Sequence, residues 1–217
     1  MEINLVVEHS DFTITSVRMQ HLRRLRILVI AVLVFSYLSL PAARADFERG
    51  VSAMKQDDYP AAFKEWVKSA ADGHLRAQYN LGVLYENGLG VEKNPAQAAK
   101  WYIVSAEGNY APAQYNLAEL YYYGSGVPHS KTSALKWYMK AALQLDELAM
   151  YAVGQMYVNG DGVSQDLTTA YMWLYLSKKL GHADSPVALE AISPLLETGD
   201  MEKAMQSAEA WLEGKTY

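Results

Sequence analysis

Apolar and small residues recur along the chain at helical spacing, in blocks that repeat every 36 residues. In the first block they occupy positions 77, 81, 84 and 85, and intervals of three and four residues place such positions on one face of a helix. Matching blocks begin at Ala113 and Ala149. A fixed period between about 20 and 50 residues is typical of stacked repeat proteins. The pattern therefore predicts an all-α protein built from successive copies of one unit.

Each block continues through two glycines into a second apolar stretch. The first glycine, at 88, 124 and 160, is expected to close the first helix in the left-handed conformation. The second, at 90, 126 and 162, permits a further turn. A residue that can cap a new helix follows in each copy, namely Asn94, Ser130 and Asp166. The second helix then carries a small residue and a tryptophan: Ala98 and Trp101, Ala134 and Trp137, and Ala170 and Trp173. Two antiparallel helices per copy are predicted.

The pattern weakens at both ends. A degenerate first copy spans residues 46–73, where Asp58 is expected to begin a helix. Clear copies follow at about 74–109, 110–145 and 146–181. Residues 183–217 depart from the period and predict two capping helices, with Ser185 and Asp200 as expected caps. A terminal pair that covers the apolar face of the last copy is expected in such arrays.

The repeat resembles the Sel1-like repeat family, relatives of the tetratricopeptide repeats. The resemblance rests on Ala-x-x-x-Leu-Gly-x-x-Tyr, Gly-x-Gly-Val and Ala-x-x-Trp, over about residues 62–182. It implies a right-handed α-α superhelix, or solenoid, whose first helices line a concave face, and a role as a protein-interaction adaptor, often in bacterial envelopes. One position departs from the pattern. A glycine that joins successive copies, present as Gly73 and Gly181, is replaced by Asn109 and Leu145. Because leucine takes the left-handed conformation poorly, we expect a different geometry at Leu145.

The first 45 residues have the features of a secretory signal peptide. Arg23, Arg24 and Arg26 precede an apolar run over 27–40, and Ala43-Arg44-Ala45 resembles a cleavage site. The run is shorter than the roughly 20 residues that span a bilayer as a helix, so no permanent membrane span is expected after cleavage. We expect cleavage after Ala45 and a periplasmic or secreted protein. Translation from Met19 instead of Met1 is an open alternative.

Charge and cysteine content exclude several kinds of function. The chain has 19 basic residues (Lys and Arg) and 24 acidic residues (Asp and Glu), of which residues 1–45 hold five basic and three acidic ones. The remaining chain has 14 basic and 21 acidic residues, a net charge of −7. So acidic a chain is a poor match for phosphate backbones, and no nucleic-acid partner is expected. The absence of cysteine excludes disulfides, thiolate catalysis and cysteine-ligated metals.

Candidate binding residues are those that vary between copies while their neighbours repeat. They lie on one side of each first helix, together with a recurring tyrosine at 79, 115 and 151, and this side is predicted to be the concave surface. The tyrosines have two interpretations: packing between adjacent first helices, or contact with a partner. Tyr122 and Tyr123 have no tyrosine counterpart in the other copies. The full candidate set is Arg76, Tyr79, Val83, Glu86, Tyr115, Glu119, Tyr122, Tyr123, Tyr151 and Gln155.

Catalytic and metal-binding patterns are weak. His74, His129 and His182 lie near separate junctions and form no His-x-x-x-His pair, so no metal or other cofactor is expected. Ser52-Ala-Met-Lys55 and Ser133-Ala-Leu-Lys136 match the Ser-x-x-Lys motif of penicillin-interacting enzymes, but the companion Ser-Asp-Asn and Lys-Thr-Gly elements are missing. The leading hypothesis is an exported, non-catalytic scaffold that binds a protein or peptide of the cell envelope. The alternatives are an envelope hydrolase or β-lactam- or peptidoglycan-binding protein, and a structural part of an envelope assembly.

Overall fold

The structure is a computed structural model that describes residues 43–215, and all of its regular elements are helices. Residues 43–54 form the first described helix. Nine α-helices and one short 3₁₀ helix follow within the described part: α2 (Tyr59–Ala71), α3 (Leu75–Asn87), α4 (Pro95–Glu107), α5 (Ala111–Tyr123), α6 (Lys131–Ala142), α7 (Glu147–Asn159), α8 (Leu167–Lys179), α9 (Ser185–Ile192), η1 (Ser193–Leu195) and α10 (Thr198–Glu213). The expected all-α fold of helix pairs is confirmed.

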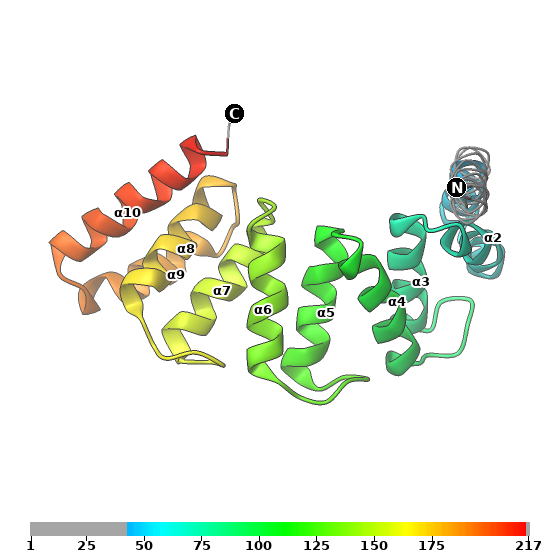
Figure 1. Cartoon of the computed structure of the whole chain (residues 1–217), viewed down its shortest axis with the longest axis horizontal. Helices are drawn as coiled ribbons and strands as arrows, with labels where there is room; N and C mark the ends of the chain where they lie inside the picture. The colour runs from blue at the N-terminus through cyan, green and yellow to red at the C-terminus, as the bar shows by residue number, and fades with distance from the viewer. Residues whose placement is uncertain (1–42, 216–217) are drawn as a thin grey trace, which may run out of the picture.

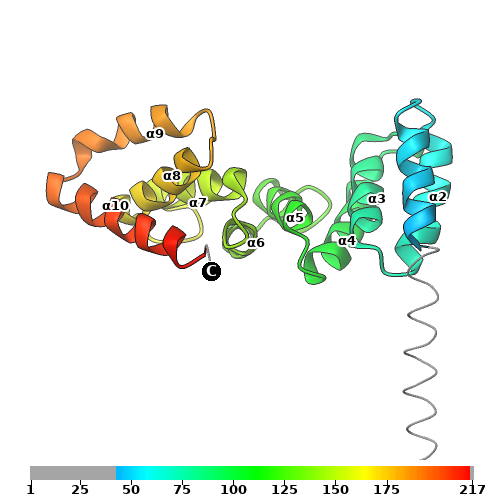
Figure 2. The ribbon, with the colours of Figure 1, turned by 90° about the horizontal axis from the view of Figure 1, so that it is seen from above.

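The helices stack in chain order as an extended array (Figure 1). Within each copy the two helices pack against each other, as α3 with α4, α5 with α6 and α7 with α8. Each second helix also contacts the next first helix, as α4 with α5 and α6 with α7. At the C-terminal end both α9 and α10 pack on α8 (Figure 2). This arrangement is that of a helical-repeat solenoid with a terminal cover.

Small residues and aromatic rings fill the core between the helices. Ala98, Ala134 and Ala170 have no exposed surface, as expected from their pairing with the tryptophans. Trp173 is buried, whereas Trp101 and Trp137 are half-buried at the edge of the core. The tyrosines that follow the two half-buried tryptophans, Tyr102 and Tyr138, lie deeper than the tryptophans do. The depth of these tyrosines matters for the candidate site.

The glycine pair fixes how one copy meets the next. The first glycines, at 88, 124 and 160, all have φ near +70° and end the first helices as predicted. Gly126 has φ +72°, and a Cβ added there would lie 2.3 Å from the carbonyl carbon of Pro95, at the start of α4 in the preceding copy. Gly90 and Gly162 make equally close approaches, to Tyr59 and Lys131. The second glycine is therefore required at a contact between copies as well as for its turn.

The predicted caps of the repeat are confirmed, and those of the C-terminal helices are wrong. Side-chain oxygens of Asn94, Ser130 and Asp166 accept backbone N–H groups three residues on. Helix α9, in contrast, includes Ser185, whose hydroxyl is buried and donates to the hydroxyl of Ser177. Helix α10 begins before Asp200, which forms an ion pair with Lys203 in the first turn. Packing onto α8, rather than local capping, sets these two starts.

The expectation of a different backbone geometry at Leu145 is also wrong. Leu145 has φ +69° and Asn109 has φ +67°, in the same left-handed region as Gly73 and Gly181. The N–H of Leu145 donates to the carbonyl of Ala142, which closes the turn. The contacts of the flanking copies impose this conformation on leucine, although it costs about 1–2 kcal/mol for a residue with a Cβ.

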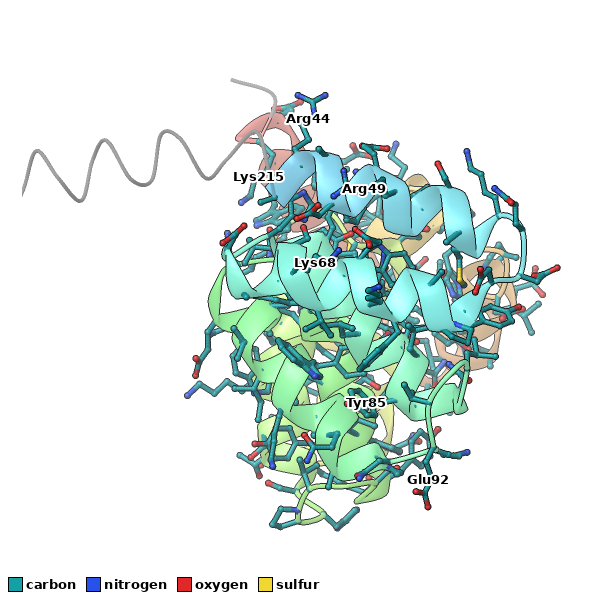
Figure 3. The ribbon with its side chains drawn as sticks, turned by 90° about the vertical axis from the view of Figure 1, so that its right-hand side faces the viewer. Arg44, Arg49, Lys68, Tyr85, Glu92 and Lys215 are labelled. Atoms are coloured by element: carbon teal, nitrogen blue, oxygen red, sulfur yellow. The ribbon has the colours of Figure 1, made fainter. Side chains whose placement is uncertain are left out.

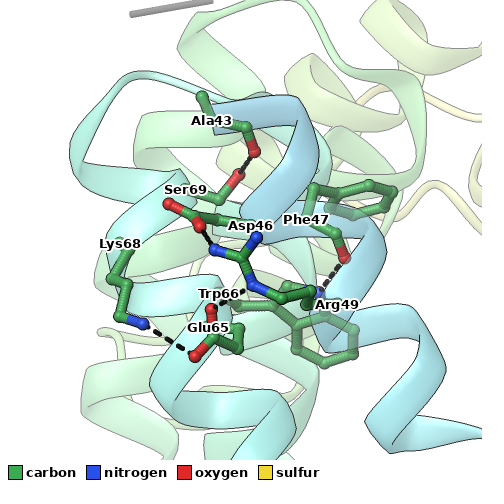
Figure 4. A network of polar contacts seen from close by, with 8 residues as sticks. All are labelled: Ala43, Asp46, Phe47, Arg49, Glu65, Trp66, Lys68 and Ser69. Carbon is green, nitrogen blue, oxygen red and sulfur yellow. Dashed lines mark hydrogen bonds and ion pairs between the residues drawn. The ribbon is translucent and has the colours of Figure 1, made fainter. Parts of the chain in front are cut away.

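The helix at residues 43–54 packs on α2 at the N-terminal end of the array, where Arg49 and Lys68 lie on neighbouring helices (Figure 3). The Ser69 hydroxyl donates to the carbonyl oxygen of Ala43 at 2.7 Å, and the Trp66 indole donates to that of Phe47 (Figure 4). Ala43 is 3% exposed. The predicted cleavage point after residue 45 therefore lies inside a described helix. The expected signal segment before residue 43 lies outside the described residues.

Candidate functional site

A cleft of about 280 Å³ opens between α5 and α7. Helix α5 supplies four of its side chains, α6 supplies one, and α7 supplies six; the turn after α8 closes one end. The lining is mainly aromatic. It consists of Tyr115, Glu119, Tyr122, Tyr123, Tyr138, Leu148, Tyr151, Ala152, Gln155, Met156, Asn159 and His182. Six of the ten residues predicted from the sequence are thus brought together in one cleft.

A single carboxylate lies within this aromatic lining. The Tyr138 hydroxyl donates a hydrogen bond to Oε1 of Glu119, from α6 to α5. Burial of Tyr138, followed by this hydrogen bond to a carboxylate, raises the pKa of its phenol. Tyr138 is therefore a hydrogen-bond donor at all physiological pH values, and it fixes the position of Glu119.

Tyr122 connects α5 to the loop of the following copy. Its hydroxyl donates to Oδ2 of Asp161 at 2.7 Å, and Lys131 forms an ion pair with the same carboxylate. The hydrogen bond to Asp161 is the main cause that raises the pKa of Tyr122 to about 12. The two donors, Lys131 first, lower the pKa of Asp161. One function of Tyr122 is therefore structural, while its ring still lines the cleft.

Tyr123 and Tyr151 line the cleft from α5 and α7, respectively. Tyr123 is 71% exposed, and its ring meets that of Tyr122 edge to face, with 5.1 Å between centroids. The Tyr151 ring stacks on His182 with centroids 4.3 Å apart. Tyr115 lies deeper, edge to face with Tyr138, and burial, then the charges of Glu119 and Asp146, raises its pKa to about 12. The cleft thus has an exposed aromatic rim and a buried polar base.

The four other predicted residues lie outside this cleft. The Arg76 guanidinium lies over the Phe47 ring at 5.1 Å, and Val83 packs against the core around α4. Glu86 accepts a hydrogen bond from the Tyr102 hydroxyl at 2.6 Å. Tyr79 packs against Tyr102 and Tyr110, as the packing interpretation of the tyrosines predicts. The interpretation that the tyrosines contact a partner is compatible with Tyr115 and Tyr151, because both pack against neighbouring rings and also line the cleft.

Sequence reasoning missed half of the lining residues, namely Tyr138, Leu148, Ala152, Met156, Asn159 and His182. Tyr138 belongs to a second helix, and His182 to the turn after α8, whereas all the predicted residues lie on first helices. The recurrence of tyrosine directly after tryptophan, at 102 and 138, is a sequence signal that could have revealed Tyr138. No comparable signal marks His182.

The weak catalytic patterns have structural explanations where the structure describes them. The Ser133 N–H donates to the Ser130 hydroxyl, which in turn donates to the Ser133 hydroxyl, so Ser133 belongs to the cap of α6. Ser52 lies on the first described helix, and its carbonyl accepts the Gln56 side chain. Between residues 43 and 215, no group of three His, Cys, Asp or Glu side chains is placed to hold a metal ion. Over the same residues, no helix has the length and hydrophobicity needed to span a bilayer.

Two solved structures are similar to this chain in sequence and in fold. A crystal structure of c5321, a protective antigen of uropathogenic Escherichia coli with an SLR fold, is 30% identical with a TM-score of 0.68, and the match covers 74% of this chain and 36% of that one. A Sel1 repeat protein from Oxalobacter formigenes is 31% identical with a TM-score of 0.64, over 68% of this chain and 59% of that one. The chain therefore spans only part of the length of each.

Among curated proteins, DAP3-binding cell death enhancer 1 of Rattus norvegicus and of Mus musculus is 39% identical over 49 residues. That match covers 23% of this chain and 10% of either relative. The Sel1 repeat family matches residues 75–110, 111–144 and 148–182, which overlap the three copies found from the 36-residue period. Sel1 repeats are a scaffold family that typically mediates protein interactions, and no catalytic family is evident. The chain is a Sel1 repeat protein with three Sel1 repeats.

Proposed function

We propose that this protein is an exported, non-catalytic scaffold that binds a segment of a partner protein in the cleft between α5 and α7. The observation that carries the proposal is the exposed aromatic ring of Tyr123, next to an open cleft on a stacked array of helices. Exposed tyrosine gives a large contact area and loses little side-chain entropy on binding. A preformed cleft also reduces the ordering cost of association.

The comparisons support the class of function without naming a partner. The rodent relatives are described by name as DAP3-binding, and their match to this chain covers 49 residues. Export is supported by the basic and apolar segment before residue 43. A periplasmic or secreted location, with a partner in the cell envelope, follows from that segment.

Site-specific photo-crosslinking in living cells tests the binding site. A photo-reactive residue at position 123 should give discrete adducts with partner proteins, because this side chain is exposed at the rim. The matched control is position 100, also exposed, but on second helix α4 and outside the cleft lining. Identical adducts from the two positions, or none from position 123, would contradict the proposal. Sequencing the N-terminus of the protein from the cell envelope tests export separately.

A further inference from the structure

The cleft between α5 and α7 differs from the equivalent groove between α3 and α5 at two side-chain positions. In that first groove, Tyr79 packs edge to face against Tyr110 and contacts Tyr102, and the side-chain amide of Asn116 donates to the Tyr102 hydroxyl at 3.0 Å. Contacts among these four side chains cross the space between the helices. The residues 36 positions later are Tyr115, Asp146, Tyr138 and Ala152.

Two of those replacements open the second groove. Ala152 stands where Asn116 stands one copy earlier, and it lines the cleft without reaching the Tyr138 hydroxyl as Asn116 reaches Tyr102. Asp146 stands in the place of Tyr110, and its side chain accepts the N–H of Ala149 as the cap of α7. The ring that closes the first groove is thus exchanged for a carboxylate. The second groove gains both volume and negative charge.

The charge of the cleft has no counterion among its lining residues. Glu119 is its one carboxylate, and the lining includes no Lys or Arg. Oε1 of Glu119 accepts the Tyr138 hydroxyl, whereas Oε2 makes no hydrogen bond within residues 43–215. Asp146 lies close enough to act on Tyr115 together with Glu119. A half-buried carboxylate with an unused oxygen favours a ligand that donates hydrogen bonds and carries positive charge.

The tyrosine rings around Glu119 favour the same kind of ligand. The faces of aromatic rings attract cations within about 6 Å, and the guanidinium group also stacks on them. This protein already uses that interaction on its own surface. Lys140 Nζ lies 4.0 Å from the centre of the Trp137 ring, and Lys131 Nζ lies 5.4 Å from that of Tyr122. In the cleft, Tyr123 and Tyr151 belong to the same lining as Glu119, and Tyr123 is exposed.

We infer that the cleft binds a cationic side chain, arginine or lysine, of the partner segment, with Glu119 as its counterion and the surrounding tyrosines as its walls. This inference rests on the proposed function and specifies its ligand. An arginine donates to Oε2 of Glu119 while its flat guanidinium lies between the rings. A neutral or acidic side chain gains no charge pairing there, and an acidic one is repelled by Glu119 and Asp146.

Peptides selected from a random displayed library test the inference with the whole protein. Selection on the wild type, followed by removal of peptides that also bind Tyr123→Ala, isolates peptides that use the cleft. These peptides should be enriched in Arg or Lys. Replacement of the critical arginine by citrulline, which is neutral and nearly the same shape, should weaken binding about tenfold or more.

Glu119→Gln and Glu86→Gln form a matched pair for the charge. Both substitutions keep an oxygen that can accept the neighbouring tyrosine hydroxyl, Tyr138 in one case and Tyr102 in the other. Glu119→Gln should weaken the arginine peptide about tenfold and leave the citrulline peptide unchanged, whereas Glu86→Gln should change neither. Peptides that need Tyr123 but lack a cation, or that bind Glu119→Gln as well as the wild type, would overturn this inference and leave the proposed function standing. Failure to find any peptide that needs Tyr123 would overturn both.

Discussion

Gly126→Ala tests whether the second glycine of the turn controls the contact between copies. The Cβ of alanine would lie 2.3 Å from both the carbonyl carbon and the carbonyl oxygen of Pro95 and 2.6 Å from the nitrogen of Ala96. All three are backbone atoms of the preceding copy, so no side-chain rotation relieves the clash. The start of α4 must move away from the loop, which loosens the interface between the first two clear copies.

Two other glycines separate this clash from the backbone strain. Gly181 has φ +100° with nothing within 4 Å of an added Cβ, and Gly124 has φ +70° with the Cβ of His129 at 3.0 Å. Alanine at a left-handed position costs about 1–2 kcal/mol, and the lower entropy of its unfolded chain offsets about 0.4–1 kcal/mol of that. Gly124→Ala, at nearly the same φ as Gly126, should therefore cost about 1 kcal/mol, and Gly181→Ala should cost more, because φ +100° lies outside the left-handed region of residues with a Cβ. Gly126→Ala should cost a further 1–3 kcal/mol or so beyond Gly124→Ala from overpacking.

Urea unfolding followed by far-ultraviolet circular dichroism measures the three free energies of unfolding. Because stability in a repeat array is a sum of copies and of interfaces between neighbours, Gly126→Ala is also expected to broaden or split the transition. Gly124→Ala and Gly181→Ala should keep one sharp transition. A cost for Gly126→Ala within about 0.5 kcal/mol of that for Gly124→Ala would refute the argument, since these two glycines share nearly the same φ.

Three further predictions concern titration, capping and the N-terminal helix. Burial, then the charge of Arg76, lowers the pKa of His74, so the folded protein favours the neutral ring that caps α3. The resulting contribution to stability is present above the ordinary pKa of about 6.5 and is lost as the pH falls. His74→Asn should therefore flatten the pH dependence of the free energy of unfolding between about pH 7.5 and 5. Hydrogen bonds from Thr169 lower the pKa of Asp166. Asp166→Ala should therefore cost about 1 kcal/mol of stability in thermal unfolding at pH 7. The cost should shrink as the pH falls below about 4, because the wild type then loses the stability that the ionised cap contributes. Ser69→Ala should cost about 1 kcal/mol in a chain that includes Ala43 and little in one that begins at Asp46; equal costs in the two chains would show that the Ser69 bond to Ala43 contributes nothing.

The sequence alone determined the repeat and most of its local structure. Helix faces, the left-handed glycines and the caps at Asn94, Ser130 and Asp166 are local properties, because each depends on residues within one or two turns. A period of 36 residues then multiplies each local signal three times. The same locality explains the errors. The left-handed Leu145 and the starts of α9 and α10 are set by contacts with other helices, which override the preferences of single residues.

The cleft was decided only by the tertiary structure. The sequence identifies Glu119 and Tyr123 as residues that vary between copies, but nothing local places the hydroxyl of Tyr138 on that carboxylate. The open groove depends on which side chains meet from three helices of two adjacent copies. It forms because Ala152 and Asp146 stand where Asn116 and Tyr110 close the preceding groove. Side-chain volume and charge at such a junction act across space, and a repeat pattern read along the chain does not contain them.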